Sequence, residues 1–183
     1  MPETPHISVV VPVRNEQGNV AELCSSLERV LIRSYEVIFV DDGSSDLTWE
    51  ELKKLHDPGC IRLLRFRKPC GKTAALVAGF KVTRGEIVFT LDGDLQDDPK
   101  EIPRFLDVLA AGPDMVCGWK KKRHDPLNKV VVSRIFNFVV GRLTGLRLHD
   151  INCGFKVFRG DLARSLQFYG EMHRFLPVIV ASQ

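Results

Sequence analysis

Short runs of apolar and β-branched residues alternate along this chain with segments in which apolar residues recur at helical spacing. The runs predict strands and the longer segments predict helices. The predicted strands lie at 7–12, 36–40, 61–66, 86–91, 115–117 and 155–158. The predicted helices lie at 20–31, 47–55, 72–83 and 127–145, with another that begins at Pro99 and further helices after 158. This regular alternation indicates an α/β protein with an open, mostly parallel sheet and helices on both faces.

Polar turns follow several of the predicted strands. In an open α/β sheet, ligands bind beyond the carboxyl ends of the strands. Acidic turns at 41–45 and 92–98 occupy such positions after the second and fourth predicted strands. We therefore expect a functional site at this edge of the sheet.

Length and composition narrow the possible function classes. The 183 residues suit a single domain, 1–183, and a content of 44% hydrophobic and 27% charged residues is typical of a soluble globular protein. The formal net charge of +3 does not suggest bulk nucleic-acid binding. The charge is unevenly placed, because acidic residues cluster at 92–101 and basic residues at 119–134. An acidic cluster can hold a cation, and a basic cluster can hold anions.

Cysteine usage and hydropathy exclude other classes. The five cysteines form no C-x-x-C pair, so a disulfide framework or zinc site is not expected and a reducing cytosolic setting is favoured. The first residues lack the basic region and apolar run of a signal peptide. The longest apolar region, 130–148, is interrupted by arginines. We expect no transmembrane helix within this chain.

The segment 92–98, with sequence DGDLQDD, carries the densest charge. Two carboxylates about 4 Å apart repel by roughly 1 kcal/mol in water and roughly 4 kcal/mol near a protein surface. A divalent cation turns this repulsion into binding, and hard oxygen ligands suit Mg²⁺ or Mn²⁺. Gly93 allows the backbone to approach a phosphate closely. The alternative is an acidic turn that caps the next helix, the role we expect for Asp97 or Asp98.

Three other polar segments could contact a nucleotide. Asp42 follows a strand and could accept hydrogen bonds from ribose or a base, although a plain Asp-Gly turn is the preferred interpretation of this segment taken alone. The segment 12–16, PVRNE, could contact a nucleotide or form an ordinary loop with a helix cap. The segment 67–72, RKPCGK, resembles a phosphate-binding loop only loosely, because the full G-x-x-x-x-G-K-[ST] spacing is absent.

A basic segment precedes the predicted helix 127–145. Residues 120–123 are KKKR, and Lys129, Ser133 and Arg134 follow. A basic loop that leads into an apolar helix suits an anionic membrane surface or a lipid phosphate held there. The alternative is a solvated basic loop beside a core helix.

Five motifs occur in order at 12–16, 41–45, 71–75, 92–96 and 150–156, with sequences PVRNE, DDGSS, GKTAA, DGDLQ and DINCGFK. Together they resemble the motif series of polyprenyl-phosphate sugar transferases, the dolichol-phosphate mannose synthase-like branch of family-two glycosyltransferases. The resemblance covers nearly the whole chain. It implies a Rossmann-like GT-A fold, a GDP- or UDP-linked sugar donor, a Mg²⁺ or Mn²⁺ cofactor, and inversion at the anomeric carbon.

The resemblance also implies roles for particular residues. Residues expected to bind the donor are Pro12, Arg14, Glu16, Val40, Asp42, Gly71, Lys72 and Gly93. Residues expected to hold the metal are Asp92, Asp94 and Gln96, and the candidate catalytic residues are Asp92, Asp94 and Asp150. Residues expected to face the acceptor phosphate are Lys120, Lys129, Ser133 and Arg134. Two positions depart from the family pattern, since Arg14 replaces a usual aromatic residue and Lys120 stands where arginine is common. A lysine cannot make the bidentate phosphate contact of an arginine.

The reaction expected from the resemblance is transfer of a sugar to a polyprenyl (dolichyl or undecaprenyl) phosphate. A phosphate monoester has its second pKa near 6 and is already ionised at neutral pH. The enzyme then needs no strong general base, so we expect Asp150 to order its loop rather than accept a proton. The alternatives are a metal-dependent nucleotidyltransferase and a non-catalytic module that binds a nucleotide sugar or a lipid.

The same resemblance places the protein at the cytoplasmic side of a membrane, where its lipid acceptor lies. A homo-oligomer is possible. Related proteins continue with a further basic segment after the position that matches Gln183. We therefore expect this chain to be truncated at its C-terminal end, to bind donor and to turn over poorly.

Overall fold

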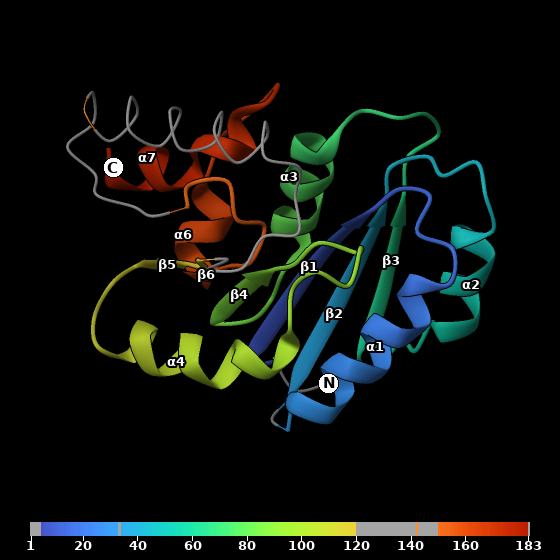
Figure 1. Ribbon diagram of the computed structural model, residues 1–183, viewed down its shortest axis with the longest axis horizontal. Helices are drawn as coiled ribbons and strands as arrows, with labels where there is room; N and C mark the ends of the chain where they lie inside the picture. The colour runs from blue at the N-terminus through green and yellow to red at the C-terminus, as the bar shows by residue number, and fades with distance from the viewer. Residues whose placement is uncertain (1–4, 33, 120–141, 143–149, 183) are drawn as a thin grey trace.

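The computed structural model describes residues 5–32, 34–119, 142 and 150–182 (Figure 1). A six-stranded sheet runs through it in the order β3-β2-β1-β4-β6-β5. The strands are β1 (Ile7–Val13), β2 (Tyr35–Asp41), β3 (Ile61–Arg65), β4 (Ile87–Thr90), β5 (Met115–Cys117) and β6 (Lys156–Arg159). Each predicted strand is present, and its ends lie within one residue of the expected positions.

The sheet is mostly parallel, as the alternating pattern predicts. Strands β1 to β4 pair in parallel, whereas β6 runs antiparallel to both β4 and β5. The reversal follows from the connection into β6, which enters from 150–155 beside the carboxyl end of β4. Periodicity gives the length of a strand but not its direction, so the sequence did not reveal this reversal.

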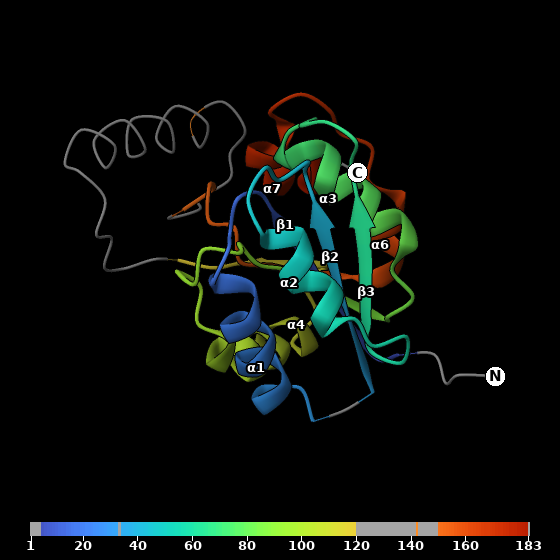
Figure 2. The same cartoon turned by 90° about the vertical axis from the view of Figure 1, so that its right-hand side faces the viewer.

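Helices cover both faces of the sheet (Figures 1 and 2). Helices α1 (Asn19–Val30), α2 (Thr48–Leu55) and α4 (Ile102–Ala110) pack on one face. Helices α3 (Lys72–Val82), α6 (Gly160–Ser165) and α7 (Leu176–Ala181) pack on the other. Two short 3-10 helices, η1 (Pro99–Glu101) and η2 (Met172–Phe175), precede α4 and α7. The predicted helix 127–145 lies outside the described residues except for Arg142, which is helical.

The central strand β1 shows why the fold needs two helical layers. Val9 and Val11 point into the cluster under α1 and α4, and Val10 between them points into the cluster under α3. Side chains alternate along a strand, so a run of valines presents apolar surface to both faces. Full burial of one such side chain contributes about 1.5–3 kcal/mol. A charged residue at any of these positions would leave one layer without its partner surface.

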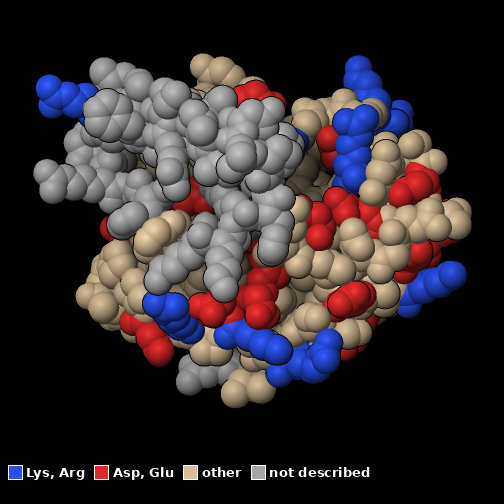
Figure 3. All heavy atoms as spheres, viewed as in Figure 1, with Lys and Arg blue, Asp and Glu red and all other residues tan. Residues whose placement is uncertain are grey.

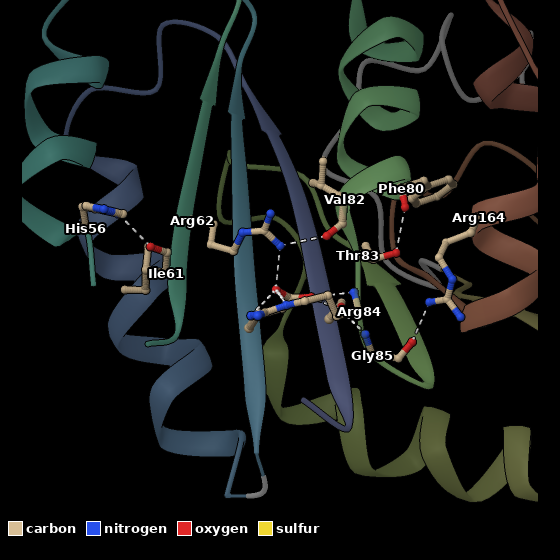
Figure 4. A network of polar contacts seen from close by, with 11 residues as sticks. His56, Ile61, Arg62, Phe80, Val82, Thr83, Arg84, Gly85 and Arg164 are labelled. Atoms are coloured by element: carbon tan, nitrogen blue, oxygen red, sulfur yellow. Dashed lines mark hydrogen bonds and ion pairs between the residues drawn. The ribbon is translucent and has the colours of Figure 1, made fainter. Parts of the chain in front are cut away.

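The amino-terminal edge of the parallel strands is tied by a buried carboxylate. Glu36, near the start of β2, accepts hydrogen bonds from Ser8 Oγ at 2.7 Å and from Arg62 Nη1 at 3.0 Å. The backbone N–H of Arg84 donates to it at 2.7 Å, and the Arg84 guanidinium adds a further contact. Arg62 also donates to the Val82 carbonyl at 2.8 Å (Figure 4). Strands β1, β2 and β3 and the turn after α3 are therefore joined at one point.

The starts of two helices differ slightly from expectation. Helix α2 begins at Thr48 with Leu47 at the N-cap position, one residue later than predicted, and Asp46 still accepts hydrogen bonds from the Thr48 N–H and hydroxyl. Asp98 caps η1 by accepting from the Lys100 N–H. Within the described part of the chain, no helix has the length and hydropathy required to span a bilayer.

Candidate active site

A cavity of about 320 Å³ opens at the carboxyl edge of the parallel strands. It lies between the loops that follow β1, β2 and β4 and the first residues of α3. The residues that line it are Pro12, Val13, Arg14, Glu16, Asp42, Gly71, Lys72, Asp92, Gly93 and Asp94. The register explains their convergence, because Val13 lies opposite Asp41 and Val10 lies opposite Thr90 in neighbouring parallel strands.

The loop after β4 presents two carboxylates to this cavity. Asp92 is half-buried and forms an ion pair with the ammonium group of Lys72, the first residue of α3. Asp94 is exposed, and one of its oxygens accepts from the Gln96 N–H at 3.1 Å. Leu95 adopts a positive φ of 61°, which a non-glycine residue rarely does. This backbone turn is part of what directs Asp92 and Asp94 to the same cavity.

Asp97 has a role in this loop that differs from the capping role expected for Asp97 or Asp98. It is buried, and its Oδ2 accepts from the Asp92 N–H at 3.2 Å. Asp98 provides the helix cap. Asp97 therefore fixes the backbone of the residue whose side chain faces the cavity.

Asp42 lines the cavity and also holds one of its walls. Its Oδ1 accepts from the backbone N–H of Cys70 at 2.6 Å, and its Oδ2 accepts from that of Gly71 at 3.0 Å. Gly71 has φ of 92°, a conformation that strongly favours glycine. The segment 67–72 is thus anchored to the end of β2, and this anchor places Lys72 beside Asp92.

The loop after β1 is fastened to the loop after β2. The Asn15 N–H donates to Ser44 Oγ at 3.0 Å, and Asn15 Oδ1 accepts from the Ser45 N–H at 2.9 Å. The Glu16 N–H donates to Thr48 Oγ1 at 2.8 Å. Gly93 lies so close to this loop that a Cβ there would approach Val13 Cγ1 to 2.8 Å. The loop after β4 therefore has little room for a side chain at position 93, where it meets the end of β1.

Charge around the cavity is local. Arg14 and Asp94 are exposed, and Lys72 and Asp92 are half-buried and paired with each other. Among the coloured residues of Figure 3, acidic and basic side chains are interspersed over the drawn face. Recognition of a charged ligand then depends on these few side chains and not on the small net charge of +3.

The metal that the resemblance implies can be tested against these groups. In the described part of the chain, no three His, Cys, Asp or Glu side chains are grouped as a complete metal site. Two carboxylates, one already paired with an ammonium group, fit a hard cation whose other ligands come from a diphosphate and water. The donor set offered by the described residues therefore fits Mg²⁺ or Mn²⁺ shared with a ligand.

A match to the model of glycosyl transferase family 2 covers residues 8–166. The chain belongs to this family. It has a GT-A fold, as the resemblance implies. The glucosyl-3-phosphoglycerate synthase of Mycobacterium tuberculosis, solved with Mn²⁺, UDP-glucose and phosphoglyceric acid, superposes with a TM-score of 0.69 at 23% identity, over 86% of this chain and 58% of that one.

Two curated relatives of this family-2 chain act on polyprenyl phosphates according to their names. The dodecaprenyl-phosphate galacturonate synthase of Rhizobium johnstonii is 37% identical over 96% of this chain and 54% of its own length. The undecaprenyl-phosphate 4-deoxy-4-formamido-L-arabinose transferase of Pseudomonas paraeruginosa is 36% identical over 94% of this chain and 52% of its own length. The chain therefore spans about half the length of these relatives.

The structure brings most of the residues that we expected to bind the donor or the metal to one cavity, with two exceptions. Val40 is fully buried in the core under α3 and does not line the cavity. Gln96 is exposed and does not line the cavity, and its backbone N–H donates to Asp94. The residues expected at the acceptor phosphate, Lys120, Lys129, Ser133 and Arg134, lie outside the described residues.

Asp150 is not among the residues that line the cavity. It is 3% exposed, and its carbonyl accepts from the Cys117 thiol at 3.2 Å. Nearby, the buried Lys156 donates to the Cys153 carbonyl. Burial raises the pKa of the Cys153 thiol to about 12, so this thiol stays neutral at ordinary pH. The segment 150–156 is thus a packed wall behind the acidic loop.

One residue near the site was missed by sequence reasoning. His173 in η2 pairs through Nδ1 with Thr73 Oγ1 at 2.7 Å, next to Lys72 at the start of α3. Burial, with the positive charges of Lys72 and Arg174, lowers the pKa of His173 to about 4. The two partners are separated by 100 positions along the chain, and no local pattern links them.

Proposed function

We propose that this chain carries the sugar-transfer site of an enzyme that moves a sugar from a nucleotide diphosphate sugar to a polyprenyl phosphate. Membership of glycosyl transferase family 2 and the names of the two curated relatives support this reaction. The observation that carries the proposal is the convergence of Arg14, Asp42, Lys72, Asp92 and Asp94 on one cavity. These side chains offer contacts for a nucleoside, a diphosphate and a divalent cation.

Each side of the cavity suits one part of the donor. Asp42 and Arg14, which line the cavity, would contact the nucleoside, because a carboxylate can accept from ribose or base groups and a guanidinium can stack on a base. Lys72 and Gly93, which also line it, would contact the diphosphate, since an ammonium group and a backbone without Cβ both allow close approach of phosphate oxygens. Asp92 and Asp94 would hold Mg²⁺ or Mn²⁺ against the same diphosphate.

The chemistry follows from the charges. A phosphate oxygen of the acceptor attacks the anomeric carbon, the bond from that carbon to the donor diphosphate breaks, and the nucleoside diphosphate leaves with the electron pair. Attack opposite the leaving group inverts the anomeric carbon. When bound, the cation supplies Lewis-acid stabilisation of the leaving diphosphate. Lys72 adds positive charge beside the same oxygens.

No strong base is required in this scheme. The acceptor phosphate has its second pKa near 6 and carries its negative charge at neutral pH. The buried position of Asp150, outside the lining of the cavity, supports a structural role for that residue. The protein's tasks are then to position the two substrates and to screen their charges.

The proposal for the acceptor site rests on the sequence alone. Lys120, Lys129, Ser133 and Arg134 are proposed to face the acceptor phosphate, and the run 120–123 is proposed to lie at the cytoplasmic surface of a membrane. Lysine and arginine near an anionic membrane contribute about 1 kcal/mol each. Binding of the chain to anionic liposomes, compared with binding after replacement of 120–123 by serine, tests this part separately.

The main test is a screen of UDP- and GDP-linked sugars with polyprenyl phosphate, with and without Mn²⁺. We expect release of nucleoside diphosphate and formation of a glycosylated lipid phosphate only with Mn²⁺. Formation or cleavage of inorganic diphosphate would instead identify a nucleotidyltransferase. Donor binding without turnover, by this chain and by a longer version alike, would identify a binding module.

A further inference from the structure

Gly154 lies directly against the carboxylate of Asp92. A Cβ at Gly154 would lie 2.4 Å from Asp92 Oδ2 and 2.6 Å from both Cγ and Oδ1. Real Cβ atoms essentially never approach other heavy atoms this closely. The three nearest atoms all belong to one carboxylate, so the first group that a side chain at this position would meet is that of Asp92.

The backbone of Gly154 does not itself demand glycine. The glycines with positive φ are Gly18, Gly43, Gly71, Gly112 and Gly170, and Gly154 is not among them. Any residue could adopt its backbone conformation without the strain of the left-handed region. What excludes a side chain at this position is therefore the neighbouring carboxylate.

The segment that contains Gly154 is held in place by several contacts and forms a wall against Asp92. Its carbonyl accepts from Thr90 Oγ1 at 2.7 Å, at the end of β4. The next residue, Phe155, is buried and stacks on Phe105 with ring centroids 4.3 Å apart. The Phe155 carbonyl accepts from the Gly118 N–H at 2.9 Å. A side chain at 154 would consequently displace Asp92 and not the segment 150–156.

Asp92 is confined from other directions as well. Its carboxylate pairs with the Lys72 ammonium group, and its N–H donates to Asp97 Oδ2 at 3.2 Å. The side chain of an aspartate has only two rotatable bonds, so a wall on one side and a lysine on the other leave little choice of rotamer. Gly154 supplies the wall.

We propose that Gly154 is a positioning residue that sets the rotamer of Asp92 and thereby the direction in which its carboxylate meets a cation. This proposal rests on the proposed function in its assignment of Asp92 to the metal. It gives the motif at 150–156 a role as a support that packs against the carboxylate of Asp92 in the acidic loop. Loss of an outer support of a metal ligand typically weakens metal binding about 10–100-fold.

The test combines Gly154→Ala with Asp92→Ala in a double-mutant cycle read by thermal unfolding without metal. Gly154→Ala alone should lower the midpoint by about 2–4 °C. In the Asp92→Ala background the same change should cost little, because the three atoms that the new Cβ meets are gone. Equal losses in both backgrounds would overturn the proposal, since the constraint would then lie in the backbone.

A second readout is Mn²⁺-dependent binding of UDP and of GDP, measured by calorimetry with whichever nucleotide binds the parent chain. Gly154→Ala should raise the Mn²⁺ concentration for half-saturation about tenfold or more and leave metal-free nucleotide binding unchanged. Gly59→Ala is the matched control, because Gly59 has no positive φ and adjoins only the exposed Asp57. Unchanged Mn²⁺ dependence in Gly154→Ala, with Asp92→Ala defective, would overturn the inference. Unchanged Mn²⁺ dependence in Asp92→Ala would overturn the metal assignment of the proposed function, and the unfolding cycle would still decide the contact.

Discussion

The two edges of the sheet hold carboxylates in opposite ways. At the amino-terminal edge, Glu36 is fully buried and accepts hydrogen bonds from Ser8, Arg62 and Arg84. At the carboxyl edge, Asp94 is exposed to a cavity, and Asp92 beside it is half-buried against a single lysine.

The difference separates a structural carboxylate from one available to a ligand. A buried charge is tolerated only when its hydrogen bonds are complete, and the protein completes those of Glu36 itself. A carboxylate that binds a cation must keep its oxygens accessible, so the cation and the bound ligand, and not the protein, provide the partners of these oxygens. Substitutions at the two edges should therefore affect different measurements, one ligand binding and the other stability.

The largest expected effect is that of Asp94→Ala on donor binding. Loss of one charge-assisted ligand costs about 1.5–3 kcal/mol, which corresponds to roughly ten- to hundredfold weaker binding. Calorimetry of UDP- or GDP-sugar binding with Mn²⁺ measures it. The fold should be unaffected because Asp94 is exposed. Asp98→Ala, at the cap of η1 in the same loop, is the control and should bind donor normally. Equal Mn²⁺-dependent affinity in the parent and Asp94→Ala would exclude Asp94 from the site.

The converse substitution at the other edge is Glu36→Ala. It should lower the free energy of unfolding by about 1–3 kcal/mol, since the Arg62 and Arg84 groups that it satisfied lose their acceptor. Both arginines can reach solvent, which keeps the loss below that of a fully buried pair. Urea unfolding gives the value. Mn²⁺-dependent donor binding should not change, and a large change there would contradict the separation of the two edges. Glu86→Ala, an exposed residue of the same edge, should be nearly neutral.

The pH dependence of the stability lost in Glu36→Ala tests whether hydrogen bonds to the ionised carboxylate cause that loss. Burial tends to raise the pKa of Glu36, but hydrogen bonds from Ser8, Arg84 and Arg62 outweigh it and hold the pKa below the ordinary value of 4.5. A lowered pKa in the folded state gives stability that is present above 4.5 and lost as the pH falls through the folded value. The difference in unfolding free energy between the parent and Glu36→Ala should be constant from about pH 7 to pH 5 and shrink in more acidic solution.

His173 should act in a different pH window. Its pKa falls from the ordinary 6.5 to about 4, mainly through burial, so it is neutral in the folded protein at neutral pH. The charged groups that influence it are Lys72, Arg174, Glu171 and Lys156. Because the unfolded chain takes up this proton first, stability present above pH 6.5 is lost progressively toward pH 4.

Comparison with His173→Asn measures this contribution. The slope of unfolding free energy against pH between about 6.5 and 4 should be smaller in the variant than in the parent. The Glu36→Ala variant should keep the parent slope in the upper part of this range. Identical slopes for the parent and His173→Asn would mean that His173 is not held neutral by the fold.

How far the sequence predicts these features depends on how local they are. The strands were found within one residue because each is a short apolar run, and most of the cavity residues were found because each follows such a run. Val40 was expected in the donor pocket, but its side chain points into the core, since the direction of one side chain at a strand end depends on register. The pairing of His173 with Thr73 and the contact of Gly154 with Asp92 join distant segments, and no periodicity encodes them.

The smallest expected effect on the pH–rate profile is that of Asp150→Asn. Asp150 is almost fully buried and does not line the cavity, and an ionised acceptor phosphate needs no proton acceptor. Transfer from the donor that the screen identifies should therefore keep the rise in rate with pH on the acidic side of its profile, even if the rate falls because the segment 150–156 packs less well. This rise should follow the titration of the acceptor phosphate, with a midpoint near 6. An acceptor with a lower second pKa should move this midpoint to lower pH in the parent and in Asp150→Asn alike. Disappearance of this rise in Asp150→Asn, with acceptor binding unchanged, would instead identify Asp150 as the general base.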